Sequence, residues 1–311
     1  MSGCEPWPRI AVVGAGAVGG YFGGLLARAG APVIMIGRRA FVEAANQGGL
    51  VLDTLQFQVK VRVEASTELA AVDGAEVVLF CVKTTDNAPT ARAIAPLLAK
   101  GALVLSMQNG VDNAEQIRAA AAIEALPSVV YVAASVPEAG RVKHVGRGDL
   151  VVGPKNPKTE RIAALFSRAH IPCRISENIE GELWLKLLCN CALNAISALG
   201  NSRYGEIAKS HDAKKLMEQI VDEVLAVARA ARMVLPGVHD RASGMAEAME
   251  IATQMADAFS STAQDLSRGR PTEIDALNGY IARRGAELGV PVPVNHALFT
   301  LVKLAEQKDR R

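Results

Sequence analysis

The sequence predicts an α/β protein in which a mostly parallel, doubly wound sheet is followed by an all-α C-terminal domain. Three observations predict it: a glycine-rich turn follows the first β-branched segment, strand and helix signals alternate as far as about residue 175, and only helical patterns come after. The chain has 311 residues, which is enough for two domains of about 100–200 residues each.

The first elements predict a βαβ unit. Residues 9–13 form a short β-branched strand, residues 14–19 a glycine-rich turn, residues 21–29 a helix and residues 33–36 a second strand. A strand, glycine-rich turn, helix and strand in immediate succession are typical of a Rossmann-type domain with a parallel sheet.

Strand and helix signals continue to alternate through this domain. Apolar residues recur with period two over residues 57–63, which predicts a half-buried strand paired with residues 50–55. Further strands are expected at 77–82, 102–107, 128–134, 140–146 and 149–153, and further helices at 87–99, 112–123 and 158–169.

The character of the chain changes near residue 178. Helical patterns are expected at 179–199, 211–232, 241–268, 273–288 and 294–307. The change predicts a Rossmann-type domain over residues 1–177 and a helical domain over residues 178–311. A cleft between two such domains is the expected place for a ligand.

Composition and charge exclude several classes of protein. Lys and Arg number 34 against 32 Asp and Glu, so the net charge of +2 gives no electrostatic reason to expect nucleic acid or a membrane surface as a partner. No apolar run has the length of about 18 residues that a membrane span needs, and the N-terminus lacks signal-peptide features, so a soluble cytoplasmic protein is expected. The five cysteines form no C-x-x-C pair and the five histidines have no metal-ligand spacing, so no metal site is predicted.

The glycine-rich turn predicts a dinucleotide site. Gly14 allows a tight turn, Gly16 leaves room for a pyrophosphate at a helix N-terminus, and Gly19 allows close packing of helix on strand. Free backbone amides and the helix dipole would bind the phosphates. The predicted cofactor-binding residues in this turn are Gly14, Ala15, Gly16, Ala17, Val18 and Gly19. The alternative is a glycine-rich turn without a ligand.

The end of the second strand indicates which dinucleotide is bound. Sites for NAD usually place an acid there to hold the ribose 2′-hydroxyl, but Arg38 and Arg39 stand there and no acid occurs before Glu43. A guanidinium suits a phosphate, so we expect NADP(H), with Arg38 the better candidate. The alternative is that both arginines are surface charges at the start of a helix, and the role of Arg39 stays open.

A polar stripe runs along the first helix of the second domain. From residue 183 to 199 the only strongly polar side chains are Lys186, Asn190, Asn194 and Ser197, at spacings of four, four and three, so they share one face of an otherwise apolar helix. The stripe either faces a ligand or forms a polar network within a helical core. Facing a ligand, Lys186 could protonate an oxygen that becomes negative during carbonyl reduction, while a nicotinamide supplies the hydride.

These residues stand in a pattern that resembles the ketopantoate reductase (2-dehydropantoate 2-reductase) family, which uses NADPH. The motifs occur in the family's order over nearly the whole chain: Gly14-Ala-Gly-Ala-Val-Gly19, Val82-Lys83, Gln108-Asn109-Gly110, Glu182-Leu-Trp-Leu-Lys186 with Asn190 and Asn194, and Gly269-Arg-Pro-Thr-Glu273-Ile-Asp-Ala-Leu-Asn278-Gly279. The resemblance implies a Rossmann domain followed by a helical domain.

The resemblance also implies roles for single residues. Lys186 matches the family's catalytic lysine, and Glu273 its second acid, which engages the substrate hydroxyl and orients the lysine. Asn109 is implied as a contact to the nicotinamide side or to the substrate, and Lys83 as a cofactor or substrate contact. The implied substrate ligands are Asn109, Asn190, Asn194 and, for the carboxylate, Ser261. Local alternatives remain, because Asn109-Gly110 also suits a turn and Thr272 with Asp275 also suits a helix cap.

The expected function is therefore NADPH-dependent reduction of 2-dehydropantoate to (R)-pantoate, in pantothenate and coenzyme A biosynthesis. Two alternatives are an NADP-dependent reductase of another 2-oxo acid, and a non-enzymatic NADP(H)-binding protein in which Lys186 and Glu273 need not converge. The partner is a small-molecule 2-oxo acid, and the apolar helical domain makes a homodimer plausible.

Overall fold

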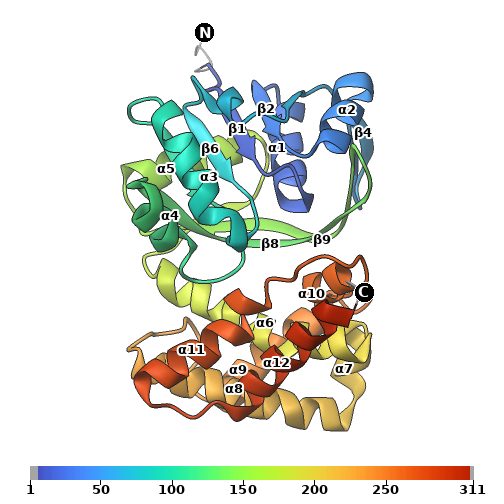
Figure 1. The fold of residues 1–311 in the computed structure, drawn as a ribbon, viewed down its shortest axis with the longest axis vertical. Helices are drawn as coiled ribbons and strands as arrows, with labels where there is room; N and C mark the ends of the chain where they lie inside the picture. Colours follow the sequence, from blue (N-terminus) through green and yellow to red (C-terminus); the bar gives the residue numbers. More distant parts are fainter. Residues whose placement is uncertain (1–5, 309–311) are drawn as a thin grey trace. The chain divides into compact units, whose positions relative to one another are not determined.

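The computed structural model describes residues 6–308 and divides the chain into two compact units (Figure 1). The first, which we call the sheet unit, comprises Met1–Gln108 and Asp112–Ile179. The second, the helical unit, comprises Glu180–Arg311 together with Asn109–Val111, a short loop from within the sheet unit's part of the sequence.

Six parallel strands form the Rossmann-type part of the sheet unit, which confirms the predicted fold class. Their order across the sheet is β8-β7-β6-β1-β2-β5, with β1 and β6 in the middle. The strands are β1 (Ile10–Val13), β2 (Val33–Ile36), β5 (Glu64–Ser66), β6 (Val77–Phe80), β7 (Leu103–Ser106) and β8 (Ala125–Glu138).

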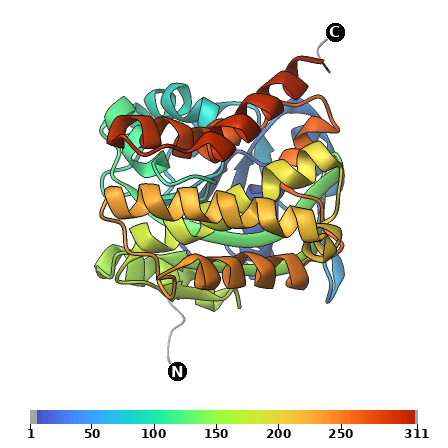
Figure 2. The same ribbon diagram turned by 90° about the horizontal axis from the view of Figure 1, so that it is seen from below.

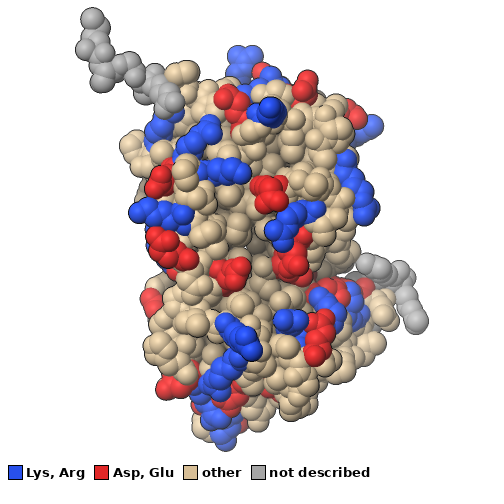
Figure 3. Space-filling model, turned by 90° about the vertical axis from the view of Figure 1, so that its left-hand side faces the viewer, with Lys and Arg blue, Asp and Glu red and all other residues tan. Residues whose placement is uncertain are grey.

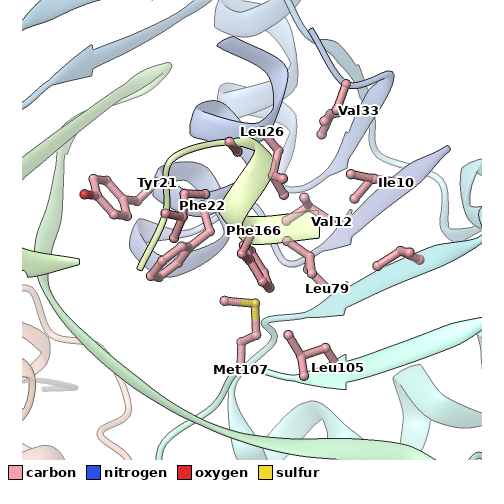
Figure 4. Close-up of a cluster of buried hydrophobic side chains, with 14 of the residues drawn as sticks. Ile10, Val12, Tyr21, Phe22, Leu26, Val33, Leu79, Leu105, Met107 and Phe166 are labelled. Carbon is pink, nitrogen blue, oxygen red and sulfur yellow. The ribbon is translucent and has the colours of Figure 1, made fainter. Parts of the chain in front are cut away.

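Both faces of this sheet are covered by helices, as side-chain alternation in β1 illustrates. Ile10 and Val12 join the core formed with α1 and α5, whereas Ala11 and Val13 join the core formed with α3 and α4. Figure 4 shows the first core, in which Phe22 of α1 and Phe166 of α5 lie with ring centroids 6.2 Å apart. The helices are α1 (Ala17–Arg28), α2 (Arg39–Gly48), α3 (Asn87–Ile94), α4 (Asn113–Ala121) and α5 (Pro157–Arg168), with 3₁₀ turns η1 (Leu69–Val72), η2 (Thr84–Asp86) and η3 (Ala95–Leu97).

Four more strands extend the sheet beyond β8. The predicted antiparallel pair is present as β3 (Leu50–Asp53) and β4 (Gln58–Val61), and β10 (Cys173–Ile175) pairs with β9. β9 (Arg141–Val152) is one long strand antiparallel to β8, where the sequence analysis expected separate strands at 140–146 and 149–153. The strand continues because Gly148, at φ +139°, takes up a bulge in the pairing instead of ending the strand.

The helical unit contains no strand among its described residues, as predicted. α8 lies between α9 on one side and the α11–α12 pair on the other (Figure 2). The elements are α6 (Ile179–Gly200, whose first residue belongs to the sheet unit), α7 (Tyr204–Lys209), α8 (His211–Ala230), α9 (Arg241–Gln254), α10 (Ser261–Leu266), η4 (Ile274–Ala276), α11 (Asn278–Leu288) and α12 (Pro293–Lys308).

Two predicted helices are broken in the structure. The helix expected over 241–268 is interrupted between α9 and α10, because the Ser260 hydroxyl accepts from the amide of Ala263 and starts a new helix. The helix expected over 273–288 begins as the 3₁₀ turn η4, and α11 starts only at Asn278 after Leu277 leaves helical geometry.

α6 is the longest helix that the structure describes, with 22 residues. It is long and apolar enough to span a membrane by length and composition, but 67% of its most apolar window is buried within the protein, as in the core helix of a folded soluble protein. On the face of the molecule drawn in Figure 3, basic and acidic side chains are interspersed, in keeping with the net charge of +2.

Candidate active site

The turn between β1 and α1 is built around two glycines that leave no room for side chains. Gly14 has φ +103°, and a Cβ there would lie 2.7 Å from the backbone of Cys81 at the end of β6. A Cβ on Gly19 would lie 2.3 Å from the carbonyl oxygen of Gly14 and 2.8 Å from Cγ1 of Val12. These two glycines therefore set the close approach of α1 to the strands.

Gly16 differs from its neighbours because nothing lies near it. A Cβ there would meet no atom within 4 Å, so packing does not demand a glycine at this position. Gly16 caps α1, no side chain caps the first amides of the helix, and the first turn carries no acid. Open space and a helix N-terminus without a side-chain cap fit a pyrophosphate beside Ala15, Ala17 and Val18.

Two more predicted cofactor residues, Arg38 and Lys83, follow β2 and β6, the strands on either side of β1. Arg38 follows β2 as the N-cap of α2, Arg39 is the first residue of that helix, and both are exposed. Lys83 is partly buried after β6, where it caps η2. An exposed guanidinium with no acid between Gly37 and Val42 fits the 2′-phosphate of NADP better than the 2′-hydroxyl of NAD.

The helical unit brings Lys186 and Glu273 together through Asn109. Nζ of Lys186 donates to Oδ1 of Asn109 at 2.9 Å, and Nδ2 of Asn109 donates to Oε2 of Glu273 at 3.0 Å. All three side chains are partly buried. An ammonium can only donate and a carboxylate can only accept, so the two partners fix which way the Asn109 amide faces. We call these three residues the Lys186 cluster.

The loop that carries Asn109 follows a buried polar network in the sheet unit. Gln108, the last residue before the loop, is 6% exposed, donates to the carbonyl of Val82 at 2.9 Å and also bonds to Asn87. Asn87 in turn donates to Asn113, just beyond the loop, at 2.8 Å. The network fixes the chain on both sides of residues 109–111. Neither Gln108 nor Asn87 was predicted as a site residue, although an amide directly after a predicted buried strand is the available signal for Gln108.

The polar stripe on α6 divides into two halves. Lys186 and Asn190 are partly buried, whereas Asn194 and Ser197 are almost fully buried. Oδ1 of Asn194 accepts from the Tyr204 hydroxyl at 2.9 Å, and the Ser197 hydroxyl accepts from the amide of Ser260 at 3.1 Å. The second half therefore takes part in a structural network, the alternative that the sequence left open.

Ser260 and Thr272, which directly precede the predicted site residues Ser261 and Glu273, form hydrogen bonds within the protein. Ser260 caps α10, and Ser261 is the exposed first residue of that helix. Thr272 does not cap a regular helix. Its hydroxyl accepts from the amide of Ile274 at 3.2 Å and donates to Glu306 at 2.6 Å.

Comparison with known proteins identifies the family. Residues 10–157 match the family model described as Ketopantoate reductase PanE/ApbA, and residues 178–306 match the model of its C-terminal part. The chain belongs to the ketopantoate reductase family. Members of that family are NADP-dependent oxidoreductases, and so is this chain.

Individual relatives of this ketopantoate reductase family member agree over its whole length. A 2-dehydropantoate 2-reductase from Pyrobaculum aerophilum is 34% identical over 297 residues, which cover 96% of this chain and 98% of the relative. One from Pyrococcus horikoshii is 32% identical, with 96% and 97% covered. The crystal structure of a PanE/ApbA family ketopantoate reductase from Ralstonia eutropha JMP134 is 46% identical, with a TM-score of 0.90 and 97% and 100% covered.

Proposed function

We propose that this chain reduces 2-dehydropantoate to (R)-pantoate with NADPH, the reductive step of pantothenate and coenzyme A biosynthesis. Family membership supports the reaction, since relatives that match over nearly the full length are named 2-dehydropantoate 2-reductase. The single observation that carries the proposal is the Lys186 cluster, in which a lysine and a carboxylate bond to the same asparagine.

Lys186 is the proton donor in this proposal. Bound NADPH supplies a hydride to the carbonyl carbon of the substrate. The carbonyl oxygen then gains negative charge, and the Lys186 ammonium both stabilises that charge and transfers a proton to the oxygen.

Asn109 and Glu273 orient the donor and the substrate. The Asn109 carbonyl accepts from the Lys186 ammonium and so fixes where the end of this side chain lies. The Glu273 carboxylate, held by the Asn109 amide, would receive the substrate hydroxyl. Fixing both groups in this way lowers the entropy cost of reaching the reactive geometry.

Three polar residues are proposed to hold the rest of the substrate. Asn190 lies one turn along α6 from Lys186 and is partly buried, which suits a contact to the substrate's polar groups. Asn194 lies one turn further, is almost fully buried and uses its oxygen for Tyr204, so any contact to the substrate would come from its amide nitrogen. Ser261 offers an exposed hydroxyl for the carboxylate.

NADPH is proposed to bind to the sheet unit. The turn Gly14–Gly19 and the first amides of α1 would hold the pyrophosphate, and Arg38 the 2′-phosphate. Lys83 would contact the cofactor or the substrate. A homodimer and a cytoplasmic location also remain part of the proposal.

The Lys186 cluster bears on one of the two alternative functions and not on the other. A non-enzymatic NADP(H)-binding protein would have no need for Lys186 and Glu273 to meet at one asparagine, so the cluster argues against that alternative. A reductase of a different 2-oxo acid uses the same cluster, and only the substrate contacts would differ.

The test is NADPH oxidation by the purified protein with 2-dehydropantoate and with a panel of other 2-oxo acids. We expect kcat/KM to be highest for 2-dehydropantoate and the product to be the (R) enantiomer. Faster turnover of another 2-oxo acid would replace the substrate, and turnover of none would remove the reductase assignment.

A further inference from the structure

A second set of charged side chains lies directly behind Glu273 in the helical unit. Glu306 and Lys303, one turn apart on α12, reach the segment Thr272–Asp275 that carries Glu273. Nothing in the proposed mechanism uses either residue. Their contacts lie immediately before and two residues after Glu273.

Glu306 fixes the residue before Glu273. One of its oxygens, Oε1, accepts from the backbone amide of Thr272 at 2.8 Å and from the Thr272 hydroxyl at 2.6 Å. Both residues are buried, with Thr272 2% and Glu306 8% exposed. A carboxylate that accepts two hydrogen bonds inside the protein holds its partner firmly, because water cannot replace either bond.

Lys303 fixes Asp275, the second residue of η4. Its ammonium lies 2.9 Å from Oδ2 of Asp275 and 2.9 Å from the second oxygen of Glu306. The segment before Thr272, residues 267–271, is exposed and belongs to no helix or strand. The two contacts from α12 therefore hold the chain on both sides of Glu273, next to a segment without regular structure.

We propose that Lys303 and Glu306 are positioning residues for the reaction, which hold the Glu273 carboxylate at Asn109 by fixing Thr272 and Asp275. We call this pair the α12 clamp. The inference rests on the proposed function, since it assigns the clamp to the reductase reaction of the same site. Burial favours neutral Glu306, but the hydrogen bonds from Thr272 and Lys303 outweigh it and hold the pKa of this carboxyl below its ordinary value, so the clamp is charged at neutral pH.

The test is Glu306→Gln, with Lys303→Met as a second variant that leaves the more buried partner in place. We expect kcat/KM for the 2-oxo acid to fall about 10- to 100-fold, on the scale of a misplaced catalytic group, with the NADPH dissociation constant unchanged. The matched control is Glu287→Gln, which removes the acid of another i,i+3 ion pair, with Arg284 on α11, and should leave kcat/KM unchanged.

A double-mutant cycle separates positioning from a general structural effect. If Glu306 acts through Glu273, Glu306→Gln should cause no further loss of kcat in a Glu273→Ala background. An equal loss in both backgrounds, or kcat/KM within twofold of wild type in both clamp variants, would overturn the proposal.

Hydrogen exchange tests the clamp without any turnover. Glu306→Gln should speed deuterium uptake in peptides covering residues 267–277 and leave uptake in α8 unchanged. Unchanged uptake over 267–277 would also overturn the proposal. If the wild-type protein reduces none of the 2-oxo acids, the proposed function fails while this measurement still decides whether the clamp exists.

Discussion

At the scale of single residues, the site depends on one amide that joins two charged groups. Asn109 donates to a carboxylate and accepts from an ammonium, so its two ends are matched to partners of opposite charge. An aspartate of the same shape would repel Glu273, and a leucine would leave both charges without their partner.

The first prediction concerns Lys186. Lys186→Ala removes the proton and the positive charge, and kcat should fall by about 10²–10⁴-fold, the scale of a positioned general acid. NADPH binding should persist, because the residues proposed for the pyrophosphate and the 2′-phosphate lie in the sheet unit. The pH profile of kcat/KM should also lose its alkaline limb, and a variant that keeps that limb would show that the proton comes from elsewhere.

The second prediction concerns Arg38, with Arg39 as its matched control. Arg38→Ala should weaken NADPH binding by about 1.5–3 kcal/mol, the worth of a charged hydrogen bond, and leave NADH binding little changed. Arg39→Ala removes the same charge one residue later on the same exposed helix end and should have a smaller effect. Titration of both cofactors by fluorescence checks this. Equal losses of NADPH and NADH affinity in Arg38→Ala would contradict the 2′-phosphate assignment.

At the scale of secondary-structure elements, α6 carries a catalytic half and a structural half. Asn190→Ala should raise the KM for the 2-oxo acid and leave the melting temperature unchanged. Asn194→Ala should lower stability by about 1–3 kcal/mol, because the buried Tyr204 hydroxyl loses its acceptor.

Parallel melts and kinetics on the two asparagine variants separate these effects. Tyr204→Phe removes the same hydrogen bond from the other side, so its combination with Asn194→Ala should cost less than the sum of the two single changes. An Asn194→Ala protein with a normal melting temperature and a raised KM would place this residue wholly on the substrate side.

The fourth prediction concerns the turn before α1, where Gly14 is required by packing and Gly16 is proposed to be required by the cofactor. Gly14→Ala places a Cβ against the backbone of Cys81 at a positive φ, so the protein should be strongly destabilised. Gly16→Ala meets no protein atom, so the fold should be retained while NADPH affinity falls, because the Cβ occupies the space expected for the pyrophosphate. Thermal melts with and without NADPH measure both effects, and normal NADPH affinity in Gly16→Ala would argue against a pyrophosphate at this turn.

Most of the fold could be predicted from the sequence, because most of its helices and strands have a local pattern of apolar residues and glycines. The β1–α1–β2 succession, the β3–β4 pair and the apolar helix α6 all follow from periodicity and glycine placement. The unpredicted features depend on contacts distant in the chain. Gly148 ends no strand because its neighbours Arg147 and Asp149 pair with β8. At the α9–α10 break, the Ser260 amide donates to the Ser197 hydroxyl and the Ser260 hydroxyl to the Asn194 carbonyl, both on α6.

The same distinction holds for the site. The spacing of Lys186, Asn190, Asn194 and Ser197 could be seen within one helix, but their separation into two halves could not, because Tyr204 and Ser260 decide it. Nothing local links Asn109 to Lys186, which lies 77 residues further along the chain. Resemblance to a family indicated that both residues matter, and the structure supplies the bonds between them.

At the scale of the whole molecule, acid stability should depend on the α12 clamp. The pKa of Glu306 lies below its ordinary value of 4.5, so its contribution to stability is present above that value and is lost as the pH falls through the lowered pKa. The unfolding free energy of the wild type should therefore fall more steeply below about pH 4.5 than that of Glu306→Gln.

The two tryptophans allow this to be measured in one unit at a time. Trp184 is buried in α6 of the helical unit and Trp7 belongs to the sheet unit, so a Trp7→Phe background makes fluorescence report the helical unit. Glu287→Gln is again the control, and its acid unfolding curve should follow the wild type. Identical pH slopes for wild type and Glu306→Gln would show that Glu306 does not contribute.

The assignment of residues 109–111 to the helical unit has a consequence for modularity. A gene fragment that starts at residue 178 encodes Lys186 and Glu273 but not the asparagine that joins them. A chimaera could join the C-terminal half of one relative to the N-terminal half of another. It would then combine the lysine and the acid of one parent protein with the asparagine loop of the other. Both halves of such a chimaera would have to come from the same parent protein, because the proposed active site draws on both parts of the gene.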